Sequence, residues 1–168
     1  MNSSFFSSLK SVFTPDNLKD YKSYYCALRN WIIDNKEAFS EKSLLDNRLK
    51  EIISMPIDKI AFEDIMGNGM ILLQEEKRIA SRDYKSCDAL LSVISDTLWD
   101  LITINSSVEC GKCKYGDMRY VIVNYMDNKS IVVLECKTCG HVMKLDGSNF
   151  AETINSIIPA TKTDISGI

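Results

Sequence analysis

Two C-x2-C pairs constrain this chain more than any other feature of its sequence. Residues 110–113 read CGKC and residues 136–139 read CKTC, with 22 residues between them. We call these turns the first and the second knuckle. One such turn places two thiolates at neighbouring corners of a tetrahedron, and two turns complete a four-sulfur shell around Zn²⁺. Two disulfides or four core thiols are the alternatives to the predicted zinc ligands, which are Cys110, Cys113, Cys136 and Cys139.

The residues between and after the knuckles predict a small antiparallel sheet. Met118–Met126 and Ser130–Cys136 are rich in β-branched and aromatic residues, and Asp127–Lys129 between them is a natural turn. A third short strand is expected at His141–Leu145. The predicted sheet therefore has three strands, with a knuckle before the first strand and another after the second.

This order of knuckle, hairpin, knuckle and third strand resembles the zinc-ribbon domain over about residues 108–147. The resemblance implies a structural zinc ion in a closed shell and says little about function. Metal binding is expected to supply much of the folding free energy, because roughly 40 residues bury too little apolar core alone. One departure is visible: Gly140 follows the second knuckle directly, whereas Lys114-Tyr115-Gly116 follows the first. We therefore expect a looser first turn.

Apolar residues recur at three- and four-residue spacing through residues 1–105 and predict an acidic helical bundle. The predicted helices are a short one from Ser3, one over residues 15–34 starting at Thr14-Pro15-Asp16, one capped by Ser40 or Ser43 and ended at Met55-Pro56, and a short one over residues 58–66.

The longest predicted helix spans residues 80–101 and carries a heptad-type seam. Its apolar residues are four and three apart in turn: Ala80, Tyr84, Cys87, Leu91, Ile94, Leu98 and Leu101. Packing within the bundle is the preferred interpretation, and dimerisation of an adaptor through this seam is the alternative.

The predicted fold class is thus α+β, with three parts. An N-terminal helical bundle occupies residues 1–105, a three-stranded zinc ribbon occupies residues 108–147, and residues 148–168 form a short helix and a tail. That last helix is expected to carry Phe150, Ile154 and Ile157.

No pattern in the chain predicts an enzyme, so we expect no catalytic residues and no small-molecule substrate. His141 is the single histidine, and Gly67-Asn68-Gly69 lacks the G-K-[ST] of a phosphate loop. Cys26 and Cys87 are expected to act as small apolar residues. Basic residues also gather near position 80, but acidic residues lie among them and predict a solvated helix face; they are Lys77, Arg78, Arg82 and Lys85.

Charge favours a protein partner over nucleic acid. Twenty Lys and Arg face 23 Asp and Glu, a net charge of −3, whereas nucleic-acid binders usually have a basic excess. A small acidic chain without a catalytic motif is similar in general character to bacterial immunity proteins, which bind cationic nuclease toxins. We therefore expect a non-catalytic protein that binds and neutralises such a partner.

The alternative function is a nucleic-acid-binding or transcription-associated regulator that uses the ribbon. Basic residues occur in the ribbon alongside Tyr115, Tyr120 and Tyr125, a combination found at single-strand contacts. These basic residues are Lys112, Lys114, Arg119, Lys129, Lys137 and Lys144, and five acidic residues nearly cancel their charge: Glu109, Asp117, Asp127, Glu135 and Asp146. No membrane association is expected, because the longest aliphatic runs are about four residues. The N-terminus shows no secretory signal pattern, so the expected location is the cytoplasm.

Overall fold

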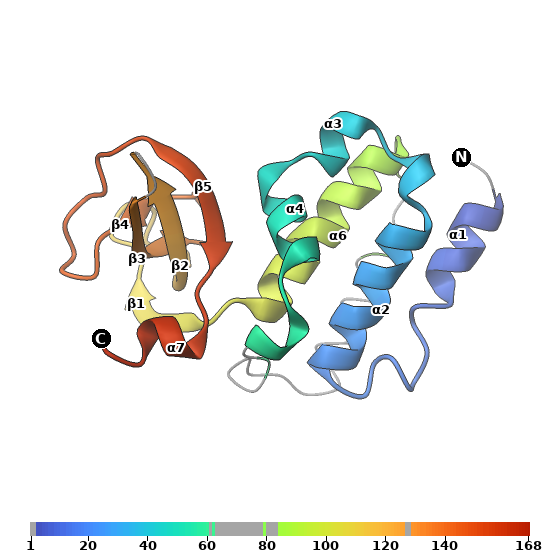
Figure 1. Cartoon of the computed structure of the whole chain (residues 1–168), viewed down its shortest axis with the longest axis horizontal. Helices are drawn as coiled ribbons and strands as arrows, with labels where there is room; N and C mark the ends of the chain where they lie inside the picture. The colour runs from blue at the N-terminus through green and yellow to red at the C-terminus, as the bar shows by residue number, and fades with distance from the viewer. Residues whose placement is uncertain (1–2, 61, 63–78, 80–83, 127–128) are drawn as a thin grey trace. The chain divides into compact units, whose positions relative to one another are not determined.

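The computed structural model describes residues 3–60, 62, 79, 84–126 and 129–168 (Figure 1). The chain divides into two compact units, which we describe separately. The helical unit comprises Met1–Ile53 and Met66–Leu101, and the β unit comprises Ser54–Ile65 and Ile102–Ile168. Among the described helices, none has the length and apolar character needed to cross a membrane.

The described residues contain six α-helices and two 3-10 turns. Their bounds are α1 Ser3–Lys10, α2 Tyr21–Asp34, η1 Lys36–Ala38, α3 Glu41–Leu44, α4 Asn47–Ser54, η2 Ile57–Lys59, α6 Cys87–Ile102 and α7 Lys162–Ile165. Residues 67–69 and three members of the predicted basic cluster, Lys77, Arg78 and Arg82, lie outside the described residues.

Helix α2 begins later than the sequence predicts. The start at Thr14-Pro15-Asp16 is wrong, because residues 15–20 form turns and Asp20 caps the helix instead. The Asp20 carboxylate accepts a hydrogen bond of 2.7 Å from the backbone N–H of Ser23. A carboxylate at this position satisfies an N–H that has no partner within the helix.

The predicted helix after Ser40 is divided into two. Ser40 caps α3 by accepting from the backbone N–H of Ser43, as one of the two predicted caps. The chain then leaves the helix at Leu45, and Asp46 accepts from the backbone N–H of Arg48 at the start of α4. Two capping residues six apart therefore produce two short helices where the apolar spacing alone predicts one.

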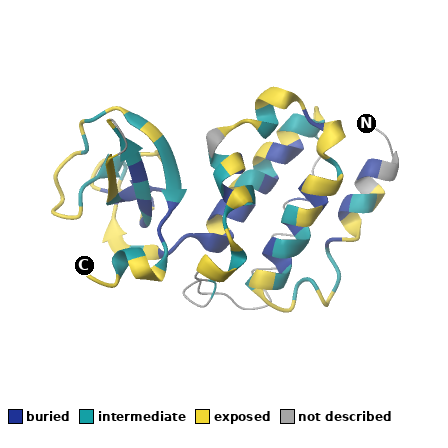
Figure 2. Cartoon of the chain, in the orientation of Figure 1, coloured by how far each residue is buried: buried dark blue, intermediate teal, exposed yellow. Residues whose placement is uncertain are grey.

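Side-chain contacts join the helices of this unit. The ring of Phe5 on α1 lies 5.0 Å from that of Trp31 on α2. The Tyr25 hydroxyl on α2 donates to the carbonyl of Ile52 on α4, and Arg48 of α4 lies over the ring of Trp99 on α6. Figure 2 shows the buried residues as stripes along these helices.

Helix α6 carries the predicted seam only from Cys87 onward. Tyr84–Ser86 are not helical, so a continuous helix from Ala80 is wrong at these residues; residues 80–83 lie outside the described part. Leu91, Ile94 and Leu98 are at most 1% exposed. These seam residues are therefore buried within this chain, so they are not exposed for an intermolecular coiled coil. The helix expected over residues 58–66 is a 3-10 turn at Ile57–Lys59, and most of the rest is not described.

The β unit contains one antiparallel sheet of five strands rather than the predicted three. The strands are β1 Asn105–Glu109, β2 Asp117–Tyr125, β3 Lys129–Cys136, β4 Val142–Met143 and β5 Ile154–Pro159. Strands β2, β3 and β4 lie where the sequence predicts them. Strand β3 pairs with one edge of β2, and β4 pairs with β3. Strands β1 and β5 both pair with β2, β1 near its start and β5 along its later half.

The predicted helix around Phe150, Ile154 and Ile157 is wrong, because this segment supplies β5. Ile157 and Ile158 lie opposite Val123 and Ile122 of β2. An isoleucine-rich segment fits a strand that covers an open edge of β2, and β-branched residues favour that conformation. Helical spacing of three apolar residues is a weaker signal than this pairing.

Candidate metal centre

The structure brings the four predicted cysteine ligands together. The sulfurs of Cys110, Cys113, Cys136 and Cys139 all lie within 4.8 Å of one another. Two of the distances, Cys110 Sγ to Cys139 Sγ and Cys113 Sγ to Cys136 Sγ, are 3.7 and 3.6 Å. A tetrahedron with metal–sulfur bonds of about 2.3 Å has edges of about 3.8 Å. All six cysteines are free thiols, so the disulfide alternative does not hold.

The first knuckle closes through backbone hydrogen bonds at the end of β1. The N–H of Lys114 donates to the carbonyl of Cys110 at 2.9 Å, and the N–H of Cys110 donates to the carbonyl of Gly116 at 3.0 Å. Lys114 has a φ of 57°, in the left-handed region. The chain thereby reverses and enters β2 with both sulfurs on one side.

The second knuckle repeats this geometry at the end of β3. The N–H of Gly140 donates to the carbonyl of Cys136 at 3.0 Å, and Gly140 has a φ of 66°. The N–H of Cys136 donates to the carbonyl of His141 at 2.8 Å. Lys114 and Gly140 therefore occupy equivalent left-handed positions, four residues after the first cysteine of each knuckle. The expected looseness of the first turn is wrong.

An apolar cluster of strand residues packs against the first cysteine of each knuckle. Cys110 and Cys136 are each 1% exposed and pack with Met118 and Leu134, while Tyr120 and Met143 lie at the edge of this cluster. The second cysteine of each knuckle is less covered, since Cys113 is half-buried and Cys139 is exposed. Burial on the strand side and exposure on the turn side define a site just beneath the surface.

Gly116 is a residue of the site that sequence reasoning did not single out. A Cβ at this position would lie 2.5 Å from Thr138 Oγ1 and 2.7 Å from Cys136 Sγ. The backbone of Gly116 in the first knuckle therefore packs directly against Cys136 and Thr138 of the second knuckle, which leaves no room for a side chain. The departure at Lys114-Tyr115-Gly116 is the sequence signal that marked this loop.

A buried ion pair holds β2 and β3 in register beside the site. Arg119 Nε and Glu135 Oε2 are 3.0 Å apart, and their side chains are 6% and 2% exposed. The two residues lie directly opposite each other, next to the pair Met118 and Cys136. A shift of one residue would separate both pairs, so this ion pair specifies the register that brings the knuckles together. Sequence reasoning missed it, because a charged pair within a strand usually faces solvent.

The two knuckles differ in the pKa of their thiols. The pKa of the Cys110 thiol is lowered to about 6, first by a hydrogen bond from the backbone N–H of Cys113 and then by the N–H of Lys112 and neighbouring thiols. For Cys139 the largest contribution, the backbone N–H of His141, lowers the pKa, but desolvation and the three other thiols together raise it to about 11. Metal binding at neutral pH must therefore displace the proton of Cys139.

The other candidate residues lie outside this cluster. Cys26 on α2 and Cys87 at the start of α6 are half-buried members of helices, and neither belongs to the four-sulfur group. His141 takes part through its backbone carbonyl, as described above.

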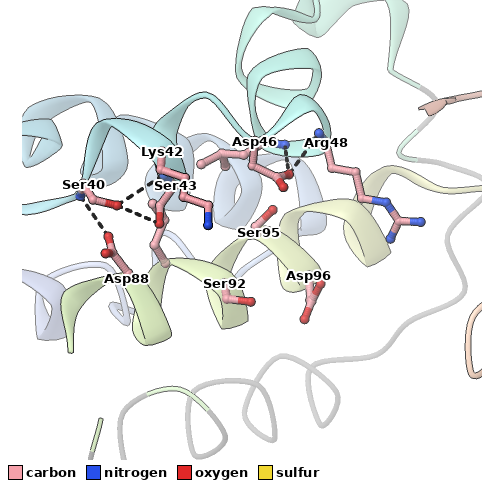
Figure 3. A pocket seen from close by; sticks show the side chains of 11 residues that line it. Ser40, Lys42, Ser43, Asp46, Arg48, Asp88, Ser92, Ser95 and Asp96 are labelled. Carbon is pink, nitrogen blue, oxygen red and sulfur yellow. Dashed lines mark hydrogen bonds between the residues drawn. The ribbon is translucent and has the colours of Figure 1, made fainter. Parts of the chain in front are cut away.

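A separate polar pocket of about 490 Å³ lies in the helical unit between the α3–α4 segment and α6. Figure 3 shows the labelled residues of α3 and the start of α4 beside those of α6, with the Asp88 carboxylate directed toward Ser40. The Asp88 carboxylate accepts from the backbone N–H of Ser40 at 2.9 Å, and this bond lowers the Asp88 pKa. Ser40, Asp46 and Asp88 thus already accept hydrogen bonds from backbone N–H groups at or near the starts of α3 and α4, which gives these three pocket residues a structural role.

The fold and the site define a mixed α/β chain with a zinc-ribbon-like four-cysteine centre. Comparison of the chain with protein families, with curated proteins and with solved structures finds no match. The centre is thus assigned from its own geometry.

Proposed function

We propose that this chain is a non-catalytic binding protein whose four-cysteine centre holds a structural zinc ion. The observation that carries the proposal is the set of four sulfurs within 4.8 Å of one another. Four soft thiolates in a tetrahedron select zinc or iron over the hard cations magnesium and calcium.

The structural role follows from the closed shell. A catalytic zinc keeps one position open for water, whereas four thiolates fill a tetrahedron. In this protein the metal would join the end of β1 to the end of β3 and so fix the two knuckles against the sheet. The free energy of metal binding would then stabilise the folded β unit.

Metal analysis of the full chain tests this assignment. Protein purified without added metal is expected to contain one zinc per chain and to be colourless, because zinc has no visible d–d or charge-transfer band. A red-brown protein with stoichiometric iron would contradict the zinc assignment. A metal-free protein with an unchanged thermal unfolding curve would contradict the site itself.

The proposed partner is another protein, with a cationic nuclease toxin as the specific case. The overall charge of −3 supports it, since a negative surface accelerates encounter with a basic partner. The acidic excess is spread over both units: the helical unit has 12 basic and 13 acidic residues, and the β unit has 8 and 10. The charge therefore does not single out the helical unit as the contact surface.

An affinity capture from the native cells tests the partner class, with nucleic acid digested in half of the sample. One basic protein recovered from both halves, which then loses nuclease activity when this chain is added, is the expected result. Partners that disappear on digestion would contradict a protein partner and would favour the second candidate.

The second candidate function is nucleic-acid binding through the β unit. It is favoured by one observation, the position of Tyr115. This side chain is 91% exposed and lies beside Lys114 at the first knuckle. Retention on heparin and release by salt would support this candidate, whereas flow-through at low salt would contradict it.

A further inference from the structure

The loop after the first knuckle presents an aromatic ring to solvent. Tyr115 is 91% exposed, and every other exposed large apolar side chain in the described residues is aliphatic or methionine, at 63% or less. An exposed tyrosine ring keeps a large flat apolar face and a polar tip available for contact with a molecule outside the chain.

The backbone on both sides of Tyr115 is fixed. Before it, Lys114 takes the left-handed conformation and donates to Cys110, the first ligand of the knuckle. After it, Gly116 packs so closely on Cys136 and Thr138 that a Cβ would overlap both. A ring displayed on a constrained loop loses little conformational entropy on binding, which is a property of preorganised contact residues.

The charged residues around this loop are mostly basic. Lys112 and Lys114 are exposed in the first knuckle loop. Lys137 of the second knuckle is tied to the start of β2, because its backbone N–H donates to the carbonyl of Asp117 at 3.2 Å. Two exposed carboxylates, Glu109 and Asp117, lie opposite each other at the base of the loop. The two knuckles together therefore have three lysines, two of them in the first loop, against two carboxylates at the base of that loop, in a chain that is acidic overall.

We infer that Tyr115 and its neighbouring lysines form a contact surface for single-stranded nucleic acid. A base would stack on the Tyr115 ring, and phosphates would lie near the ammonium groups of Lys112 and Lys114. The remaining residues of the two knuckle turns are glycine and threonine. An aromatic anchor at a protein interface is instead ringed by contacts that exclude water. This inference rests on the second candidate function and names its contact surface.

Fluorescence anisotropy with a labelled oligothymidylate of about 12 nucleotides tests the surface, using the zinc-loaded full chain at about 50 mM salt. Tyr115→Ala is expected to weaken binding by about 5- to 100-fold, whereas Tyr115→Trp keeps a stacking surface and should bind at least as tightly as the wild type. Lys112→Ala should reduce the slope of log K against log salt by about 0.7. Met126→Ala, an exposed apolar residue at the other end of β2, is the matched control and should change nothing.

The outcomes separate the surface from the function. Binding that is equally strong in the wild type, Tyr115→Ala and Lys112→Ala would overturn this surface and leave nucleic-acid binding by another face. No binding by a wild-type chain that contains stoichiometric zinc would overturn both the surface and the second candidate, and would leave the protein partner. Loss on Tyr115→Ala with recovery in Tyr115→Trp, at unchanged zinc content, would support the surface.

Discussion

The two knuckles have the same backbone but reach it with different residues. In each, the N–H four residues after the first cysteine returns to that cysteine's carbonyl, at 2.9 Å in one and 3.0 Å in the other. The residue at that position is lysine in the first knuckle and glycine in the second, with φ values of 57° and 66°. The shared hydrogen bond and the four sulfurs therefore determine the turn, and glycine only makes it less costly.

The knuckles differ more in what surrounds them. The first is continued by Gly116, which has no room for a side chain, whereas nothing lies within 4 Å of a Cβ at Gly140. The first contains the thiol with the lowered pKa and the second contains the thiol with the raised pKa. The two knuckles thus share a backbone conformation but differ in packing and in the pKa of their thiols. Each difference can be tested by a change made in one knuckle.

Loss of a ligand should have the largest effect, and it should be equal for both knuckles. Cys110→Ser and Cys136→Ser are each expected to abolish stoichiometric zinc and to unfold the β unit, because zinc binding by such sites is worth about 10–16 kcal/mol. Zinc content and thermal unfolding by circular dichroism measure this. Cys26→Ala and Cys87→Ala are the controls and should retain the metal. Full zinc and wild-type melting in either ligand variant would disprove the ligand set.

Gly116→Ala tests the close packing that distinguishes the first knuckle from the second. The new Cβ would overlap Cys136 Sγ, and a metal-bound sulfur cannot move aside. We expect a loss of about 1–3 kcal/mol in the free energy of unfolding, as in other overpacked sites, together with weaker zinc binding. Gly111→Ala in the same knuckle is the matched control, since nothing lies within 4 Å of its Cβ. Equal stability of the two variants by denaturant titration would contradict the close approach of the knuckles.

Metal affinity should fall as the pH falls, and the two knuckles should contribute in different ranges. The Cys139 thiol, with its pKa raised to about 11, holds a proton that zinc displaces, so affinity should drop at least about tenfold per pH unit between 11 and 6. Below about 6, Cys110 also holds a proton that zinc must displace, so the fall in affinity should become steeper. Competition with a chelator of known proton affinity at several pH values measures these slopes. An affinity that does not change with pH would show that the ligands are not thiols before binding.

Sequence patterns predicted most of this site because its information is local. A C-x2-C turn depends on four consecutive residues, and strands β2 and β3 carry their β-branched residues in continuous runs. The residues that join the knuckles are different. Gly116 and the pair Arg119 and Glu135 acquire their roles only when β2 and β3 lie side by side. No spacing within one strand reveals such a contact.

The elements that were predicted wrongly are those with two competing local signals. Thr14-Pro15 and Asp20 are both helix-start signals, and the structure begins the helix after Asp20, which caps it through the N–H of Ser23. Residues 154–159 have helical spacing and strand-forming residues at once, and the open edge of β2 decided for the strand. Lys114 shows a similar conflict at one residue. The knuckle pattern expects glycine at this left-handed position, but lysine occupies it in this chain.

The left-handed positions should give the smallest effects, of opposite sign in the two knuckles. Gly140→Ala places a side chain at a φ of 66° and should cost about 1 kcal/mol without any steric overlap. Lys114→Gly removes that strain but adds freedom to the unfolded chain, so we expect a gain of less than about 1 kcal/mol. Denaturant titration of the two variants measures these effects. A loss of stability in Lys114→Gly as large as in Gly140→Ala would mean that the lysine side chain holds the first knuckle closed, and that the two turns are not equivalent.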